Sequence, residues 1–339
     1  MAFKKVACIG AGRMGRGIAH SVAYAGHPIC LIDAKKRNAD EFAALKRDTL
    51  AEVADGLAMM AALGAFDAAL IPIIMDRVSV VPADQADIGL KGAAIVFEAV
   101  PEVAAAKQDA FALFDAHADD DAVLASTTST MLSTELAGLT RAPERFLNAH
   151  WLNPAFLVPL VEVSPADQTH PDILAKVIGF LESIGKVPIT CKASPGYIVP
   201  RIQVLAMNEA ARLVEEGIAS AEDVDKAVKY GFGLRFSVLG LLEFIDWGGG
   251  DILHYASKYL SNALDDPRFD APKIVHDNME AGRVGLRSGL GFFDYENVDI
   301  DAYRQRRMAD FLKAVRDAGL ARAPVLQHTA PLVQKGEKW

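Results

Sequence analysis

The stretch KVACIGAGRMGRGIAHSVAYAG, residues 5–26, starts as a short apolar run, turns through closely spaced glycines and continues as a helical pattern. Gly10, Gly12 and Gly15 in it have the spacing GxGxxG. In a strand-turn-helix unit, the first glycine permits the tight turn, the second lets the backbone approach a pyrophosphate, and the third allows the helix to pack closely on the strand. The stretch therefore predicts a phosphate-binding turn, with Arg13 and Met14 inside it, at the start of a parallel sheet.

A second apolar run, ICLID at residues 29–33, ends in Asp33. A carboxylate at the end of the second strand of such a fold accepts a hydrogen bond from an adenosine ribose and repels a 2′-phosphate. The sequence therefore predicts NAD as the cofactor in preference to NADP. Lys35, Lys36 and Arg37 follow directly and would soften the exclusion of NADP.

Short β-branched runs alternate with helical patterns through the first half of the chain, whereas helical patterns dominate after residue 193. Such alternation is typical of a doubly wound parallel sheet. We expect an α/β protein with a Rossmann-type sheet domain over residues 1–192, a helical substrate and dimerisation domain over 193–299, and a helix with a tail over 300–339. The helical patterns lie at residues 201–217, 220–231, 237–246, 251–264, 271–282 and 301–319.

The composition excludes several classes of function. The 339 residues carry 44 acidic and 35 basic side chains, a net charge of −9, which disfavours nucleic acid and anionic membranes as partners. No apolar run is long enough to span a bilayer, and the N-terminal run is too short for a signal peptide. Three cysteines without CxxC spacing indicate a reducing, cytoplasmic location, and the eight histidines show no metal-binding spacing.

Polar side chains follow several of the predicted strands at the point where each strand ends. Glu102 follows one, the cluster TTST at residues 127–130 follows another, and His150 ends a third. Ligands of open parallel sheets bind at these strand ends. Taken singly, such residues are often structural, because hydroxyl clusters cap helices and histidines form ordinary hydrogen bonds. Their repetition at one sheet edge favours a catalytic site.

The segment HWLNPAFLVPLVE, residues 150–162, has a titratable group at each end. Pro154 and Pro159 favour a turning path, so the chain can reverse and bring Glu162 back to His150. The carboxylate would fix the imidazole tautomer and favour its protonated form, as a base that takes a proton from an alcohol requires. Ser129 could then donate to or accept from the substrate oxygen.

Six ordered motifs resemble those of the 3-hydroxyacyl-CoA dehydrogenase family over residues 4–295. They are CIGAGRMGRGIA, FEAVPE with Lys107 after it, ASTTST, AHWLNPAFLVPLVEV, SPGYIVPR and RSGLGFFDY. The resemblance implies an NAD-dependent dehydrogenase in which His150 is the base, Glu162 orients it and Ser129 contacts the substrate oxygen. It also implies that Asn153 lies beside the nicotinamide and that Ala99, Glu102 and Lys107 line the cofactor pocket. A homodimer through the helical domain, with VLGLLEFI at the contact, is implied as well.

Two departures from the family pattern concern the substrate. Pro200 stands where acyl-CoA members have an asparagine that helps to hold the substrate, and no Lys or Arg occurs between Arg47 and Arg77 to bind coenzyme A phosphates. The chain also resembles members that oxidise free hydroxy acids, such as carnitine and L-gulonate dehydrogenases. Arg235 could then pair with a substrate carboxylate and Trp151 could mark the pocket.

The sequence therefore favours a small L-3-hydroxy acid, interconverted with its 3-keto acid, as the substrate. Two alternatives stay open at this point. One is an L-3-hydroxyacyl-CoA dehydrogenase, and the other is a non-catalytic nucleotide-binding relative, because Pro200 removes a contact near the catalytic group.

Overall fold

The computed structural model describes residues 5–324. The chain divides into two compact units, the first ending at Ala206 and the second beginning at Met207. The division falls inside one helix, α8 (Val199–Glu215), and lies 14 residues after the predicted domain boundary at residue 192.

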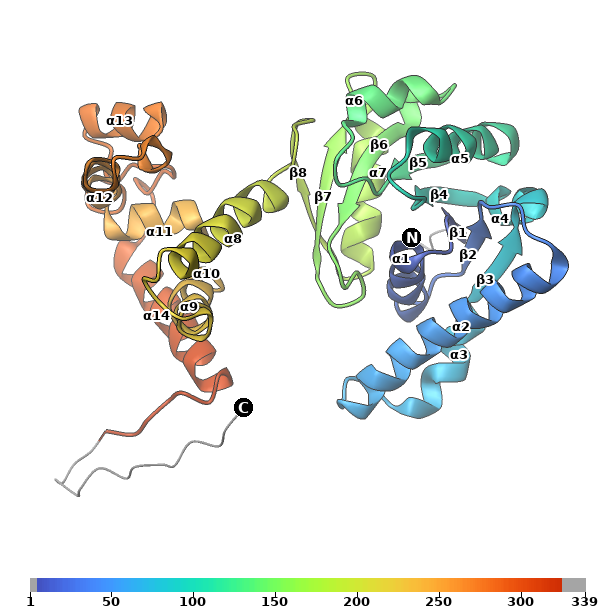
Figure 1. Ribbon diagram of the computed structural model, residues 1–339, viewed down its shortest axis with the longest axis horizontal. Helices are drawn as coiled ribbons and strands as arrows, with labels where there is room; N and C mark the ends of the chain where they lie inside the picture. Colours follow the sequence, from blue (N-terminus) through green and yellow to red (C-terminus); the bar gives the residue numbers. More distant parts are fainter. Residues whose placement is uncertain (1–4, 325–339) are drawn as a thin grey trace. The chain divides into compact units, whose positions relative to one another are not determined.

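The first unit is built on one eight-stranded sheet with the order β3-β2-β1-β4-β5-β6-β7-β8. The strands are β1 (Lys5–Ile9), β2 (Ile29–Asp33), β3 (Val78–Pro82), β4 (Ala93–Glu98), β5 (Val123–Ser126), β6 (Phe146–Trp151), β7 (Leu160–Pro165) and β8 (Val187–Thr190) (Figure 1). The run β3-β2-β1-β4-β5-β6 is parallel and has the order of dinucleotide-binding folds. The predicted doubly wound sheet is confirmed.

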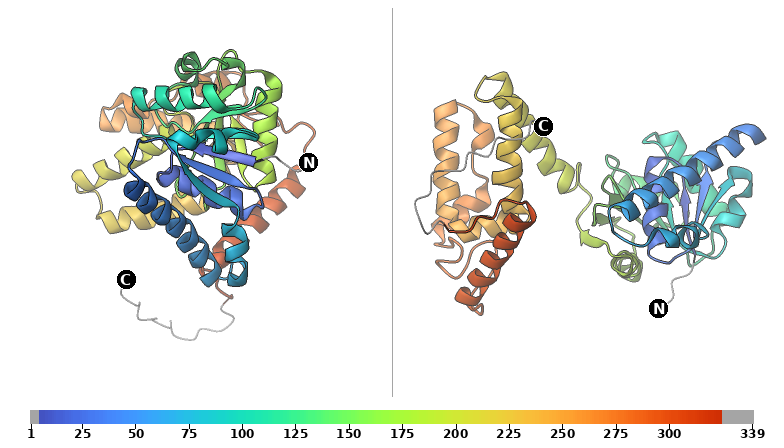
Figure 2. Two further views of the ribbon diagram at one scale, coloured as in Figure 1. Left: turned by 90° about the vertical axis from the view of Figure 1, so that its right-hand side faces the viewer. Right: turned by 90° about the horizontal axis from the view of Figure 1, so that it is seen from below.

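Helices cover both faces of this sheet (Figure 1 and Figure 2). They are α1 (Arg13–Tyr24), α2 (Ala39–Ala62), α3 (Ile71–Met75), α4 (Ala86–Leu90), α5 (Ala104–His117), α6 (Ser133–Leu136) and α7 (Pro171–Ser183). One core cluster joins α1, α2 and α7 to the sheet, and a second cluster joins α4, α5 and α6 to it. Because both faces are covered, the central strands are apolar throughout, and a polar residue within them stands out.

The sheet is not wholly parallel, which corrects the sequence-based expectation. β7 runs antiparallel to β6, and β8 runs parallel to β7. The connection from β6 to β7 spans only residues 152–159 and contains Pro154 and Pro159, which leaves no room for the crossover helix that a parallel connection needs. The hairpin makes His150 and Glu162 direct cross-strand partners.

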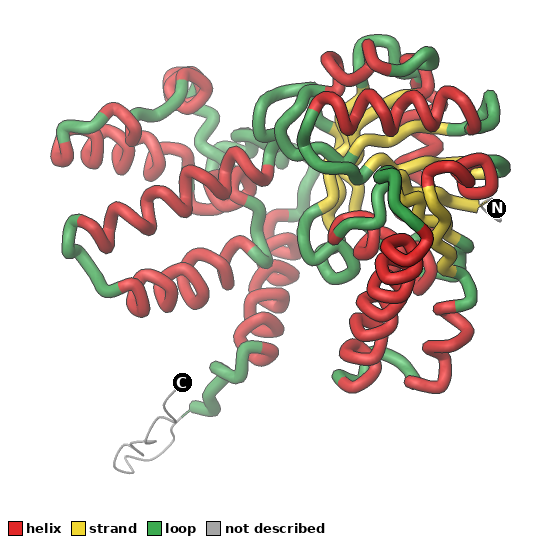
Figure 3. Tube along the Cα trace, turned by 45° about the vertical axis from the view of Figure 1, so that its right-hand side comes forward, coloured by secondary structure: helices red, strands yellow, loops and turns green. Residues whose placement is uncertain are grey.

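The second unit contains no β-strand among residues 207–324 (Figure 3). It holds the rest of α8 and then α9 (Ala221–Ala227), α10 (Leu234–Phe236), α11 (Leu241–Gly248), α12 (Gly250–Leu264), α13 (Lys273–Glu280) and α14 (Ile300–Asp317). Ser220 caps α9 by accepting a hydrogen bond from the Asp223 amide, 3.1 Å away. The predicted tail lies partly outside the described residues, from residue 325 onward.

The loop GFFDY of the second unit is held by a buried carboxylate. Asp246 accepts hydrogen bonds from the amides of Phe292 (3.0 Å) and Phe293 (2.9 Å) and from the Tyr295 hydroxyl (3.2 Å). A Cβ at Gly291 would collide with this carboxylate, so the glycine is required for the close approach. The motif RSGLGFFDY therefore has a structural explanation. No helix within residues 5–324 has the length and apolar character needed to cross a bilayer.

Candidate active site

The glycine-rich turn follows β1 and opens a cavity of about 340 Å³ at the carboxyl edge of the sheet. Its lining comes from the turn, from the end of β2 and from the segment after β4, and includes Gly10, Gly12, Arg13, Asp33 and Ala99. All five were predicted to bind the cofactor. A cavity at the N-terminus of α1 suits the pyrophosphate of a dinucleotide, because free backbone N–H groups there point outward.

The three glycines of the turn are explained by different contacts. Gly10 has a φ of 121°, and a Cβ on it would meet the Ala99 carbonyl, while a Cβ on Gly15 would collide with the Gly10 carbonyl. A Cβ on Gly12 would meet nothing within 4 Å. The fold therefore requires Gly10 and Gly15, whereas the open space at Gly12 is where a ligand would approach the backbone.

Asp33 is almost fully buried at the end of β2. Its carboxylate accepts hydrogen bonds from Arg37 Nε at 2.6 Å and from the Lys35 amide at 3.3 Å. The ion pair holds the carboxylate at the cavity wall and also occupies the Arg37 guanidinium. That guanidinium was one of three cations, with Lys35 and Lys36, that were expected to soften the exclusion of NADP. The glycine-rich turn at the start of α1 and the Asp33 carboxylate at the end of β2 both fit NAD.

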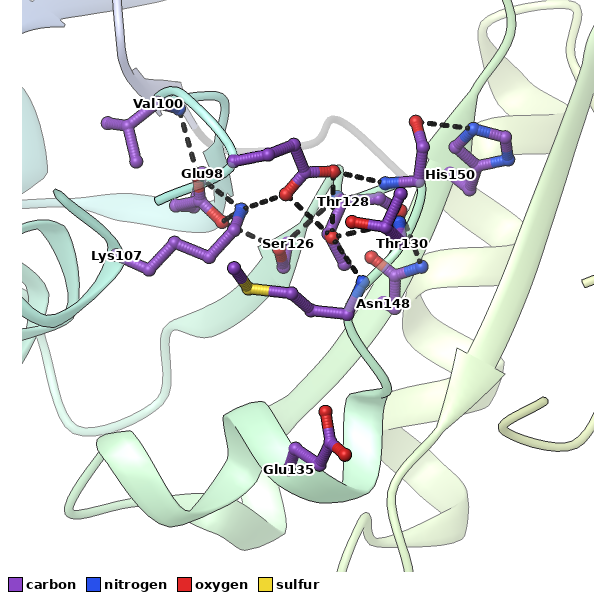
Figure 4. A network of polar contacts seen from close by, with 12 residues as sticks. Glu98, Val100, Lys107, Ser126, Thr128, Thr130, Glu135, Asn148 and His150 are labelled. Carbon is purple, nitrogen blue, oxygen red and sulfur yellow. Dashed lines mark hydrogen bonds and ion pairs between the residues drawn. The ribbon is translucent and has the colours of Figure 1, made fainter. Parts of the chain in front are cut away.

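A buried network of charges lies beneath the ends of β4 and β5 (Figure 4). Glu98 accepts hydrogen bonds from Lys107 Nζ at 2.9 Å, Ser126 Oγ at 2.6 Å and the Val100 amide at 2.8 Å. Lys107 also reaches Glu102 Oε2 at 3.3 Å, and it is only 1% exposed. Glu98 was not predicted. Its signal was a single carboxylate within the apolar strand AAIVFE, which can be buried only if it is paired.

Glu102 connects this network to the loop that carries Ser129. Its carboxylate accepts from the Thr128 hydroxyl at 2.8 Å and from the Ser129 amide at 2.6 Å. Partial burial opposes ionisation of Glu102, but the Ser129 amide, Lys107 and the Thr128 hydroxyl together hold its pKa below the ordinary value. Glu102 is therefore an ionised anchor for the loop. Glu102 and Lys107 were predicted to line the cofactor pocket, but neither side chain is part of the lining of the cavity beside Asp33.

Ser129, His150 and Glu162 form one chain of hydrogen bonds. Ser129 Oγ lies 3.0 Å from His150 Nε2, and His150 Nδ1 lies 2.7 Å from Glu162 Oε2. His150 is 4% exposed and Glu162 is fully buried, so the carboxylate must be compensated locally. The other oxygen, Oε1, accepts from the amides of Ile198 (2.9 Å) and Val199 (2.8 Å). As predicted, the chain reverses after His150 and brings Glu162 back into contact with it.

Pro200 is the second residue of α8, directly after these two amide donors. Proline fits the first turn of a helix, because an N–H there has no partner within the helix. The helix can therefore begin with Glu162 as its cap and lose no hydrogen bond at Pro200. The side-chain amide that acyl-CoA members have at this position has no counterpart at Pro200.

Two residues beside this chain were not predicted, Asn148 and Tyr197. Asn148 Nδ2 donates to the Tyr197 hydroxyl at 2.6 Å and to the Thr128 carbonyl at 3.3 Å. Tyr197 donates in turn to the Met131 carbonyl at 3.0 Å. The sequence could have pointed to Asn148, because it is a polar residue in the apolar strand FLNAHW. It lies two residues before His150 and therefore on the same face of the sheet.

A second cavity, of about 330 Å³, lies between α1, α2 and the turn after β6. Asn153 lines it together with Arg13, His20, Val53 and Phe156, so Asn153 faces a different cavity from Asp33. The two cavities share the side chains of Arg13 and Arg16.

Burial lowers the pKa of His20, in the wall of the second cavity, to about 4, so this imidazole is neutral near pH 7. The turn itself is held by Lys186 Nζ, which donates to the carbonyls of Ala155 (2.6 Å) and Val158 (3.0 Å).

Three predicted residues lie elsewhere. Trp151 is 1% exposed and packs edge-on against Phe97, so its indole belongs to the core and not to a pocket wall. Met14 packs against the core beneath the glycine turn and lines neither cavity. Arg235 belongs to the second unit, where its exposed guanidinium lies 4.7 Å from the centre of the Phe244 ring. Strand alternation explains Trp151, because residues 150 and 151 point to opposite faces of the sheet.

Within residues 5–324, no group of three or more His, Cys, Asp or Glu side chains is arranged to hold a metal ion. The cysteines Cys8, Cys30 and Cys191 are free thiols.

Comparison with known proteins identifies both units. Residues 5–194 match the family model of the 3-hydroxyacyl-CoA dehydrogenase NAD-binding domain, and residues 196–295 match that of the C-terminal domain. The chain is 31% identical to 5-formyl-3-hydroxy-2-methylpyridine 4-carboxylate 5-dehydrogenase of Mesorhizobium japonicum, covering 92% of this chain and 97% of that protein. It is also 31% identical to 3-hydroxybutyryl-CoA dehydrogenase of Clostridioides difficile, covering 86% and 99%.

A solved 3-hydroxyacyl-CoA dehydrogenase from Archaeoglobus fulgidus is similar with a TM-score of 0.72 and 30% identity, covering 94% of this chain and 100% of that one. The family models span both units, and the site contains a dinucleotide cavity and a histidine beside a hydroxyl group. The chain belongs to the 3-hydroxyacyl-CoA dehydrogenase family and is an NAD-dependent dehydrogenase that acts on a CH–OH group.

Proposed function

We propose that the protein interconverts a free L-3-hydroxy acid and its 3-keto acid, with His150 as the base. The observation that carries this proposal is the hydrogen-bonded chain from Ser129 through His150 to Glu162. The buried carboxylate of Glu162 keeps the proton of the neutral imidazole on Nδ1 and leaves the Nε2 lone pair directed toward Ser129. A hydroxyl group of the substrate placed beside Ser129 Oγ would meet this lone pair.

In the oxidation, His150 Nε2 takes the proton of the substrate hydroxyl as the carbon–oxygen double bond forms. NAD, when bound, supplies the acceptor for the hydride that leaves the same carbon. Glu162 compensates the charge of the imidazolium that results, and the two amides of Ile198 and Val199 keep the carboxylate in place. Ser129 holds the substrate oxygen through its hydroxyl. In the reverse direction, the imidazolium returns the proton to the oxygen.

The charge of residues 48–76, from the middle of α2 through α3, supports a free acid over a coenzyme A thioester. Residues 48–76 contain five acidic side chains and no basic one. The phosphates of coenzyme A carry several negative charges and are normally bound by Lys or Arg. A small hydroxy acid needs only one cation for its carboxylate, and we propose Arg235 for this role because its guanidinium is exposed and forms no ion pair within the described residues.

The second candidate is an L-3-hydroxyacyl-CoA dehydrogenase. The relative from Clostridioides difficile favours it, because that protein is named a 3-hydroxybutyryl-CoA dehydrogenase and is matched over 99% of its length. The deciding experiment measures NADH formation by the purified protein with L-carnitine, L-gulonate, L-3-hydroxybutyrate and L-3-hydroxybutyryl-CoA. Turnover confined to the thioester would contradict the free-acid proposal, and turnover confined to one free acid would support it.

We also propose that the protein is a homodimer. The helical unit exposes large apolar side chains on α12, with Ile252, Tyr255 and Tyr259 each more than half exposed. On a single chain these side chains would remain in contact with water, which disfavours the isolated protomer. The molar mass in solution, measured by light scattering, distinguishes a dimer from a monomer.

The open space at Gly12 gives a clear test of cofactor binding. Replacing Gly12 with alanine adds a Cβ that meets no protein atom, so we expect the unfolding temperature to stay unchanged. The same methyl group would stand between the backbone and the pyrophosphate, and we expect NAD affinity to fall by about 10-fold or more. Titration of NADH fluorescence measures the affinity.

Gly15→Ala is the matched variant, because its Cβ collides with the Gly10 carbonyl. For that variant we expect a lower unfolding temperature. Unchanged NAD affinity in Gly12→Ala would show that the cofactor does not approach this part of the turn.

Asp33 should determine the choice between NAD and NADP. Replacing Asp33 with alanine removes the acceptor for the ribose hydroxyl and releases Arg37, which becomes free to pair with a 2′-phosphate. We expect kcat/KM with NAD to fall by about 10-fold or more and kcat/KM with NADP to rise. The ratio of the two kcat/KM values is the measurement.

Asp76→Ala, at the C-terminal end of α3, is a control whose ratio should match that of the wild type. An unchanged ratio in Asp33→Ala would place the ribose elsewhere.

A further inference from the structure

Ser129 is exposed on a loop, yet its hydroxyl is held at hydrogen-bond distance from a buried imidazole. Glu102 bonds to the Ser129 amide and to the Thr128 hydroxyl, but neither bond restrains the carbonyls of the loop. The carbonyls on either side of Ser129 are both tied to the rest of the first unit. Asn148 donates to the Thr128 carbonyl, and Tyr197 donates to the Met131 carbonyl.

The two ties are connected to each other. Asn148 Nδ2 lies 2.6 Å from the Tyr197 hydroxyl, so one pair of side chains holds the loop at both carbonyls. Burial raises the pKa of the Tyr197 phenol far above its ordinary value, so the hydroxyl keeps the proton that it donates. Both residues are buried, which makes these hydrogen bonds stronger than equivalent bonds in water.

Tyr197 also contacts the other members of the chain. Its ring stacks on the imidazole of His150, with centroids 5.5 Å apart and planes 24° apart. The next two amides, of Ile198 and Val199, are the donors to Glu162. A segment of three residues therefore contacts the loop of Ser129, the ring of His150 and the carboxylate of Glu162.

The backbone of Tyr197 is in an unfavourable conformation. Its φ is 42°, in the left-handed region that an aromatic residue rarely occupies. Such a conformation persists only where the surrounding contacts determine it, and it is frequent at functional sites. Here the contacts are the stacked ring and the two hydrogen bonds of the hydroxyl.

We propose that Tyr197 and Asn148 are positioning residues that hold Ser129 at the distance from His150 that proton transfer requires. This inference rests on the proposed function, because it assigns the pair a task in the same reaction. Tyr197→Phe keeps the ring and its stacking but removes the hydroxyl that ties the loop. We expect kcat to fall by about 10-fold, with NAD affinity unchanged, because small misplacements of reacting groups lower turnover strongly.

The decisive comparison is made in two backgrounds, with the substrate identified by the four-substrate assay. In the wild type, Tyr197→Phe should lower kcat, whereas in Ser129→Ala it should have no further effect, because the loop then carries no hydroxyl to position. An equal loss in both backgrounds would overturn the proposal, as would unchanged kcat in Tyr197→Phe. Tyr303→Phe is the matched control, because it also removes a hydroxyl bonded to a partner, Glu243 Oε1 at 2.6 Å, in the second unit.

A measurement without substrate tests the same proposal. Amide hydrogen exchange of residues 127–132 should become faster in Tyr197→Phe and in Asn148→Ala, and should stay unchanged in Tyr303→Phe. Unchanged exchange in both site variants would overturn the proposal. Ser129→Ala by itself could leave turnover unchanged while hydrogen exchange becomes faster in Tyr197→Phe and Asn148→Ala. In that case the role of Ser129 in the proposed function would be wrong, but Tyr197 and Asn148 would still hold the loop.

Discussion

Replacing His150 with glutamine is expected to lower kcat by about 10²- to 10⁴-fold, the range that a general base contributes. Glutamine is similar in length and can still bond to Ser129 and Glu162, but its amide cannot accept a proton from an alcohol near neutral pH. NAD affinity should stay close to the wild-type value, because the cavity beside Asp33 does not include His150. Stopped-flow measurement of NADH formation and a separate NAD titration give the two quantities.

The control for this variant is His117→Gln, at the exposed end of α5. It makes the same chemical change far from the hydrogen-bonded chain, so kcat should not change. If His150→Gln retained wild-type turnover, the proposed base would be wrong. If both variants were inactive and neither showed a cooperative unfolding transition, the loss of activity would come from a failure to fold.

Replacing Glu162 with glutamine is expected to lower kcat by at least about 10²-fold, because it reverses the polarity of one hydrogen bond. The amide oxygen can accept from Ile198 and Val199, which leaves the amide NH₂ group facing His150 Nδ1. An NH₂ donor there favours the tautomer with its proton on Nε2, and that tautomer cannot accept the substrate proton. The lost carboxylate also leaves the imidazolium uncompensated.

Glu162 also caps α8, so stability must be measured beside turnover. Denaturant unfolding should show a loss of about 1–3 kcal/mol, the usual effect of disturbing a buried charged hydrogen-bond acceptor. Glu144→Gln, at an exposed carboxylate, is the matched control and should leave both quantities unchanged. Wild-type kcat in Glu162→Gln would mean that the tautomer of His150 is set by another group.

The glycine turn and Asp33 could be predicted from the sequence because their signals are local. A strand, a turn and a helix follow one another within residues 5–24, and Gly10 and Gly15 are required by backbone groups close in the chain or just after the adjacent strand. The pairing of His150 with Glu162 was also within reach, because only twelve residues and two prolines separate them. The sequence analysis missed the antiparallel direction of β7, although the connection of residues 152–159 is too short for the crossover helix that a parallel strand needs.

The remaining parts of the site depend on contacts between distant residues. Tyr197 lies 49 residues from Asn148 and 66 residues from Met131, so no spacing in the chain connects them. Glu98 is tolerated in an apolar strand only because folding brings Lys107 and Ser126 to it. Trp151 was predicted to lie in a pocket, but the alternation of β6 turns it toward Phe97 and into the core.

The sequence by itself therefore determined the fold class, the glycine-rich turn and the cofactor, and it predicted Ser129, His150 and Glu162 as the catalytic residues. Only the tertiary structure decided which oxygen of Glu162 faces His150, what compensates each buried charge and what holds the loop of Ser129. The physical reason is that covalent spacing and local periodicity act over one or two elements of secondary structure. The partner of a buried polar group is chosen by whichever strands and helices fold against it.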